Sequence, residues 1–168
     1  MGYRIRPARD EELEAAERMA AEAFAGYAAS HREWVEALVA TRPMHEIAAG
    51  GEVLVAVDDA NRAVAAVGYV GPGKPRRDFF PADWAILRML SVPPCHRGHG
   101  IARQLVDAVI ARALRDRVTT LGLYSSPVMA VAVGLYQRMG FVHQRALPVE
   151  HGLPDDLYAL DLSAHAMR

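Results

Sequence analysis

The sequence predicts a single domain of the α/β class. Strand-like and helix-like segments alternate along its 168 residues, and 52% of these residues are hydrophobic, which is enough for one compact core. The clearest unit is an apolar run at residues 84–92, followed by a glycine loop and an amphipathic segment at residues 101–114. No repeat, low-complexity tract or linker divides the chain. We therefore expect one α/β domain over residues 1–168.

Short apolar or β-branched runs bounded by turn residues indicate the strands. The runs at residues 52–57 and 63–70 flank the turn sequence Asp-Asp-Ala-Asn and predict a hairpin. The run at residues 84–92 is apolar on both faces except for Arg88, as in a central strand. The expected strands cover residues 3–7, 52–57, 63–70, 84–92, 119–125, 141–146 and 157–162.

Apolar residues at helical spacing indicate the helices. Ser30 and Glu33 have the spacing of a capping box, and Ser126 precedes Pro127 as an N-cap precedes a first-turn proline. We expect Pro43 to end the second helical region. The expected helices cover residues 10–24, 30–40, 101–114 and 127–139.

The loop before residue 101 has the chemistry of an anion site. The first N–H groups of a helix lack partners within the helix, and the helix dipole favours negative charge there. Gly98 and Gly100 have no Cβ, so a phosphate can approach the main chain closely. Arg97, His99 and Arg103 place donors around the loop. Several charge-assisted hydrogen bonds of about 1.5–3 kcal/mol each would hold a pyrophosphate.

Two better-known phosphate loops do not match this sequence. A Walker A loop needs Gly-Lys-Ser or Gly-Lys-Thr, and neither tripeptide occurs. The dinucleotide fingerprint has a third glycine where this chain has Arg103. The loop therefore favours a phosphate ligand other than a nucleoside triphosphate or a nicotinamide cofactor bound in the usual way.

The net charge and the cysteine content limit the binding partners and the cellular compartment that we expect. The formal net charge of −1 predicts no general attraction to nucleic acid or to an anionic membrane. Cys95 is the only cysteine, so no intrachain disulfide forms and a cytoplasmic location fits. Residues 1–19 carry many charges, and the chain contains neither a signal-peptide run nor a membrane-spanning run. No Cys/His cluster has zinc spacing, so we expect no metal.

Two motifs together carry a resemblance to a known family. The first is Leu90-x-Val92-x-Pro94-x-x-Arg97-Gly98-x-Gly100-Ile101-Ala102. The second, about one helix and one strand later, is Leu135-Tyr136-x-x-x-Gly140-Phe141. The chain thus resembles the GNAT superfamily of acyl-CoA-dependent N-acetyltransferases, which has a Q/R-x-x-G-x-G/A pyrophosphate motif and an L-Y-x-x-x-G-F signature. The resemblance covers about residues 54–162, and the preceding part fits the family's variable substrate-binding helices.

The resemblance implies a mixed, mostly antiparallel central sheet with flanking helices. Two adjacent parallel strands, here residues 84–92 and 119–125, would splay apart, and acetyl-CoA would enter the gap. The pyrophosphate would lie on main-chain amides of the glycine loop, and the pantetheine arm would pair with the open strand edge, with the thioester near Ser91. The implied cofactor-binding residues are Leu90, Ser91, Val92, Arg97, Gly98, His99, Gly100, Ile101, Ala102 and Arg103.

The resemblance also implies that Tyr136 is the general acid that protonates the departing CoA thiolate. The expected effect is modest, because a thiol of pKa about 8.5 is already a fair leaving group and tyrosine, near 10, is the weaker acid. An amine acceptor of pKa about 10.4 is neutral in only about one molecule in 10³ at pH 7, so its proton must be removed.

The general base is less clearly indicated by the sequence. Many relatives carry a glutamate on the central strand, but residues 85–92 and 119–126 contain no acidic side chain. Asp83, just before the central strand, is the first candidate and would act through water. Glu33, His31 and a water chain ending on backbone or on Ser125 are alternatives.

Three further features bear on the site. Met129 stands where the family often has an asparagine that contacts the cofactor arm, although a T-S-P-x-M variant occurs in many bacterial members. The basic and aromatic segment at residues 74–80 is either a solvated connection or a lid that contacts an anionic or aromatic acceptor. Asp155 and Asp156 either face a cationic acceptor or bound a turn.

We therefore expect an acetyl-CoA-dependent N-acetyltransferase that moves an acetyl group to a primary amine of a small molecule or peptide by direct attack in a ternary complex. A non-catalytic acyl-CoA-binding or sensor domain of the same fold is the alternative, and a loop for another nucleotide is a third interpretation. Tyr136 favours the first over the second, and the paired motifs disfavour the third. A homodimer is common in such folds, but the sequence does not show one.

Overall fold

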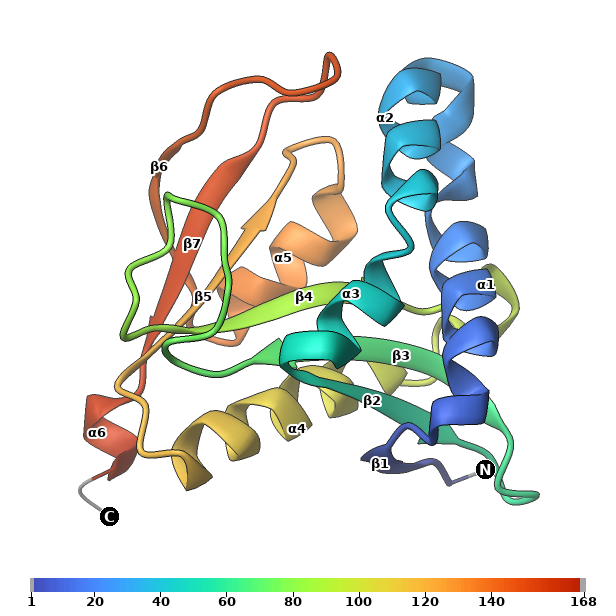
Figure 1. The fold of residues 1–168 in the computed structure, drawn as a ribbon, viewed down its shortest axis with the longest axis horizontal. Coiled ribbons are helices and arrows are strands. Elements are labelled where there is room, and N and C mark those ends of the chain that lie inside the picture. Colours follow the sequence, from blue (N-terminus) through green and yellow to red (C-terminus); the bar gives the residue numbers. More distant parts are fainter. Residues whose placement is uncertain (1, 167–168) are drawn as a thin grey trace.

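The computed structural model describes residues 2–166, which form a central sheet with helices on both faces (Figure 1). The strands of this described part are β1 (Arg4–Pro7), β2 (Glu52–Val57), β3 (Ala63–Val70), β4 (Ala85–Ser91), β5 (Thr120–Ser125), β6 (Val142–Ala146) and β7 (Asp156–Asp161). The helices are α1 (Leu13–Phe24), α2 (Ala28–Ala40), α3 (Pro43–Gly50), α4 (Ile101–Arg115), α5 (Ala130–Arg138) and α6 (Ser163–Ala166), and the 3₁₀ turns are η1 (Asp10–Glu12), η2 (Ala25–Tyr27) and η3 (Pro94–His96).

The sheet has the strand order β1-β2-β3-β4-β5-β7-β6. Every neighbouring pair is antiparallel except β4 and β5, which are parallel. The expected mixed, mostly antiparallel sheet is therefore confirmed. Within residues 2–166, no helix combines the length and the apolar character needed to cross a membrane.

Side chains that alternate along the central strands build two hydrophobic cores, one on each face of the sheet. On β2, Val53 and Val55 pack with α1 and α3, whereas Leu54 and Ala56 pack with α4. These four side chains are buried because β2 is covered on both faces. The two cores fix α1 and α4 on opposite sides of the sheet, where they flank the end of β4.

The structure corrects the expected role of Pro43, which begins helix α3 instead of ending a helical region. Proline suits a first helical position because its missing N–H would have no partner there. The Glu17 carboxylate of α1 accepts hydrogen bonds from the N–H groups of Met44 (3.1 Å) and His45 (3.0 Å), so it caps α3. This cap lies outside the local sequence, which is why no helix was expected at residues 43–50.

Two other helix starts also differ from expectation. Helix α2 begins at Ala28, and Ser30 hydrogen-bonds through its Oγ to Nδ1 of His31 (2.8 Å), a residue whose backbone (φ −138°, ψ 50°) kinks the helix. Helix α5 begins at Ala130, after a turn in which the Ser126 Oγ accepts a hydrogen bond from the N–H of Val128 (3.2 Å). In both places a serine side chain satisfies a local group in place of the expected cap.

Strands β4 and β5 are paired at one end only. Ala85 lies opposite Leu121 and Ile86 lies opposite Gly122, and beyond these two pairs the strands diverge. Figure 1 shows β5 turning away from β4. The splayed parallel pair that the family resemblance implies is therefore present. Among residues 2–166, no strand pairs with the edge of β4 beyond Ile86 on this side.

A β-bulge shapes the same stretch of β4. Gly68 lies opposite Arg88 and Ala66 lies opposite Ser91. β4 therefore contains one more residue than β3 between these two pairs. Met89, inside this bulge, has a left-handed backbone (φ 57°), and the Ser91 hydroxyl donates a hydrogen bond to its carbonyl (2.8 Å). A bulge bends its strand and re-aims the neighbouring side chains. Here the bulge lies where β4 leaves β5.

We predict that Gly122→Ala destabilises the fold, because Gly122 lies at the last paired position before the strands part. An added Cβ would lie 2.6 Å from the Trp84 ring, and overpacking of this kind costs about 1–3 kcal/mol. Gly26→Ala is the control, since a Cβ there would meet nothing within 4 Å and the expected change is within about 0.5 kcal/mol. Urea unfolding measures both; equal stabilities of the two variants would contradict this packing account.

Candidate functional site

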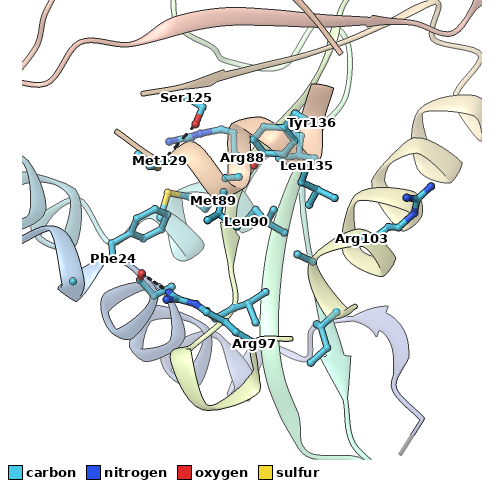
Figure 2. A pocket seen from close by; sticks show the side chains of 18 of the residues that line it. Phe24, Arg88, Met89, Leu90, Arg97, Arg103, Ser125, Met129, Leu135 and Tyr136 are labelled. Atoms are coloured by element: carbon cyan, nitrogen blue, oxygen red, sulfur yellow. Dashed lines mark hydrogen bonds between the residues drawn. The ribbon is translucent and has the colours of Figure 1, made fainter. Parts of the chain in front are cut away.

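A cavity of about 590 Å³ lies where β4 and β5 part (Figure 2). The C-terminal part of β4, the end of β5 and helix α5 form its centre. The glycine loop and the first turn of α4 form one end, and residues of α1, η2 and α2 form another wall. The divergence of the two strands therefore opens a space bordered by all the elements that the sequence motifs mark.

The glycine loop forms the anion-binding end of this cavity. Gly98 (φ 83°) and Gly100 (φ 77°) both adopt left-handed backbone conformations, which glycine adopts without strain. Gln104 N–H donates to Gly100 C=O (3.1 Å), so the N–H groups of the residues before it lack acceptors within α4. Ile101 and Ala102 line the cavity at this point. The donors and the helix dipole together suit a phosphate group.

The two arginines of the loop have different environments. The Arg97 guanidinium donates to the carbonyls of Val92 (3.0 Å) and Ala23 (3.0 Å), so it ties the loop to the end of β4 and to α1. Figure 2 shows the second of these bonds. The Arg103 side chain is exposed on the first turn of α4 and lines the cavity. Arg103 is thus the side chain freer to meet an incoming anion.

The open edge of β4 lines the middle of the cavity. Leu90 and Val92 both border it, and Arg97 already occupies the Val92 carbonyl. Main-chain N–H and C=O groups without a neighbouring strand need partners, and a ligand that itself carries amide groups can supply them. This edge therefore suits the amide-containing arm of CoA.

Three of the expected site residues do not border the cavity. Ser91 is fully buried and its hydroxyl is bonded to Met89 C=O. His99 lies with its ring 6.4 Å from the Tyr3 ring, away from the cavity lining. Asp83 precedes β4 at the end where β4 and β5 are still paired. The structure brings together the other predicted residues, which are Leu90, Val92, Arg97, Gly98, Gly100, Ile101, Ala102, Arg103 and Tyr136.

Tyr136 is held by the L-Y-x-x-x-G-F motif. Its carbonyl accepts a hydrogen bond from Phe141 N–H (3.0 Å), and Gly140 makes the required left-handed turn (φ 100°). The Tyr136 and Phe141 rings pack edge to face, with centroids 5.7 Å apart. Tyr136 is buried yet borders the cavity, and burial raises the pKa of its hydroxyl. The hydroxyl therefore stays protonated and can donate a hydrogen bond, and the same shift makes it a weaker acid than an exposed tyrosine.

Asp155, from the loop before β7, is the carboxylate on the cavity wall. Burial, and then the nearby charge of Glu150, raises its pKa to about 6, while Arg77 acts in the opposite direction. A carboxylate with this pKa is a suitable proton acceptor near neutral pH. The sequence singled out Asp155 only as a residue that either faces a cationic acceptor or bounds a turn. Its burial depends on contacts that no local pattern encodes.

The other suggested bases lie elsewhere, apart from Ser125. Glu33 is exposed and lies 3.5 Å from Nδ1 of His151, and His31 contacts Ser30. Ser125 borders the cavity, with its Oγ 4.0 Å from the sulfur of Met129. Met129 also borders the cavity, so an apolar thioether lies where many relatives are expected to have an amide. Among residues 2–166, no group of three potential metal ligands comes together.

The basic segment at residues 74–80 is held in place by hydrogen bonds from Arg76 to nearby main-chain carbonyls. Arg76 donates hydrogen bonds to the carbonyls of Gly71 (2.8 Å), Pro81 (2.7 Å) and Trp84 (2.8 Å). The segment borders a second cavity of about 300 Å³, which shares Tyr124 and Asp155 with the first. The segment therefore has a defined shape and lies beside the main cavity.

Comparison with known proteins agrees with this arrangement. A model of the acetyltransferase (GNAT) domain matches residues 49–143, more than half of the chain. N-alpha-acetyltransferase 30 of Saccharomyces cerevisiae is 34% identical over 59 residues, which are 35% of this chain and 34% of that protein. The similarity to this curated relative thus spans about one third of its length.

Solved structures share the fold over nearly the whole chain. The structure described as histone acetyltransferase HPA2 and related acetyltransferase from Corynebacterium glutamicum has a TM-score of 0.75 and 23% identity, covering 96% of this chain and 97% of that one. The PaiA N-acetyltransferase of Thermoplasma acidophilum, in complex with coenzyme A, has a TM-score of 0.75 and 18% identity, covering 96% and 99%. The family match and these folds together show that the chain belongs to the GNAT acetyltransferase family.

Proposed function

We propose that the protein is an acetyl-CoA-dependent N-acetyltransferase that acts on a primary amine of a small molecule or peptide, by direct attack in a ternary complex. One observation carries this proposal: a single cavity joins the free amides of α4 to Tyr136 and Asp155 through the gap between β4 and β5. A phosphate site, an open strand edge, a proton donor and a proton acceptor are therefore lined up along one space.

The residues present fit acetyl-CoA. The pyrophosphate would lie on the main-chain N–H groups from Gly98 to Arg103, with the Arg103 guanidinium adding a charge. The amide-containing arm would lie along Leu90 and Val92. Acetyl-CoA, when bound, supplies an activated thioester whose acetyl group can be transferred to nitrogen.

Asp155 and Tyr136 would divide the proton transfers between them. Asp155 removes one proton from the acceptor ammonium, which makes the nitrogen nucleophilic. As the C–N bond forms and the C–S bond breaks, Tyr136 donates a proton to the leaving sulfur. The nitrogen loses its second proton, which restores Tyr136, so one proton is released for each acetyl group transferred. This assignment replaces Asp83, which does not border the cavity.

We predict saturable, micromolar binding of acetyl-CoA, measured by titration calorimetry, that Arg103→Ala weakens by about 10- to 100-fold. This range corresponds to the loss of one charge-assisted hydrogen bond of about 1.5–3 kcal/mol. Arg115→Ala is the matched control, because Arg115 ends the same helix and faces Glu52 and Asp116 outside the cavity. Arg97 is a poorer probe, since its guanidinium also holds two carbonyls. Absence of binding at millimolar acetyl-CoA would contradict the proposed cofactor.

We predict that Tyr136→Phe lowers kcat by about 10- to 10³-fold, the usual range for one acid–base group, while the Kd for acetyl-CoA stays unchanged. The ring and its contact with Phe141 are retained, so thermal unfolding should be almost unaffected. Release of free CoA thiol in a screen of amines measures kcat. A kcat equal to that of the wild type would remove Tyr136 from the acid role. Tight acetyl-CoA binding without turnover of any amine would favour the acyl-CoA-binding alternative.

We predict that kcat/KM falls as the pH drops below about 6, because Asp155 must be deprotonated to accept the amine proton and its pKa is raised to about 6. Asp155→Asn should lose both this acidic limb and most of the activity. In Asp156→Asn, kcat/KM should still fall at acidic pH, but at a slightly lower pH, since this variant removes a negative charge that raises the pKa of Asp155. An unchanged acidic limb in Asp155→Asn would contradict the role of Asp155.

A further inference from the structure

Three aromatic side chains form one wall of the cavity without belonging to the core. Phe24, Tyr27 and Trp34, here called the aromatic wall, come from α1, η2 and α2 and are only half-buried. None of them belongs to either hydrophobic core of the described residues. Large apolar side chains that face a cavity instead of the core are an expected feature of a ligand site.

The aromatic wall is internally packed, so its shape is set before any ligand binds. The Phe24 and Trp34 rings meet edge to face, with centroids 5.7 Å apart and an interplanar angle of 82°. The Tyr27 and Trp34 rings meet similarly, at 6.1 Å and 84°. Leu38, one turn after Trp34, also borders the cavity. In Figure 2 the Phe24 ring points into this space. An apolar group would therefore find a rigid surface there.

The charges on the cavity wall limit what else can bind. Asp155 is the one carboxylate among the described lining residues, whereas arginine side chains come from β4, the loop, α4 and α5. One carboxylate matches one ammonium group. Arg88 is paired with Glu46 (3.3 Å), and Arg97 and Arg103 lie at the glycine-loop end of the cavity. An acceptor with several ammonium groups would therefore find no second carboxylate among the described lining residues.

We propose that the acceptor is a primary amine with a single positive charge that carries an apolar or aromatic group. The apolar group rests on the aromatic wall, and the ammonium group faces Asp155. This inference rests on the proposed function for the transfer step, but the binding surface exists independently of turnover. A free amine and the N-terminal residue of a peptide share this chemistry, and the experiment below distinguishes them.

Trp34 provides a direct reporter of acceptor binding. The chain has two tryptophans, so Trp84→Phe leaves Trp34 as the only one. In the presence of CoA, 2-phenylethylamine should change the Trp34 fluorescence saturably, and ethylamine and spermidine should bind at least tenfold more weakly. Comparison with a tripeptide that begins with phenylalanine assigns the source: tighter binding of the peptide indicates an N-terminus, and tighter binding of the amine indicates a small molecule. No saturable signal from either, or preference for spermidine, would overturn the proposal.

Two neighbouring positions on α2 give a matched pair of variants. In the Trp84→Phe protein, Leu38→Ala should raise the Kd of 2-phenylethylamine several-fold, whereas Val39→Ala should leave it unchanged, because Val39 is 46% exposed and outside the cavity. Equal effects of the two variants would contradict the proposal. If Trp84→Phe unfolds the protein, calorimetry on the wild type and the two single variants gives the same comparison. Amine binding without acetyl transfer would refute the proposed function and leave this inference intact.

Discussion

Main-chain hydrogen bonding between β4 and β5 extends over only two residue pairs, and the site depends on this early separation. β5 turns away beyond Ile86 (Figure 1), whereas β4 stays paired with β3 along its other edge, with a bulge at Met89. Main-chain N–H and C=O groups of β4 consequently face the cavity without a neighbouring strand among residues 2–166, and such groups need other partners. A ligand with its own amide groups supplies them.

The elements around the gap each supply one part of the proposed chemistry. The glycine loop and α4 place free N–H groups at one end, α5 places Tyr136 in the middle, and the loop before β7 places Asp155 on the wall. Arg97 links the loop to β4 and to α1, so the phosphate end and the acceptor side are held by the same side chain. The aromatic wall comes from the irregular junction of α1, η2 and α2, and it would determine which acceptor molecules bind.

Local sequence signals predicted the parts of the site that lie next to each other in the chain. The strand, glycine loop and helix around Gly100 are contiguous, as are the residues that hold Tyr136, and the structure places both as expected. The sequence could not show that Glu17 caps α3 from 27 residues away, nor that burial raises the pKa of Asp155. Nor could it show that the Ser91 hydroxyl is buried and bonded to the Met89 carbonyl, because the bulge at Met89 depends on how β4 pairs with β3.

We infer that acetyl-CoA occupies the gap between β4 and β5 along the exposed edge of β4. Residue-resolved amide hydrogen exchange, with and without acetyl-CoA, measures whether it lies there. Exchange should slow at the amides from Leu90 to Val92 and from Gly98 to Arg103 and stay unchanged along the β2–β3 pair. Binding that leaves those two segments unprotected, or that protects only residues outside the cavity, would show that the cofactor lies elsewhere.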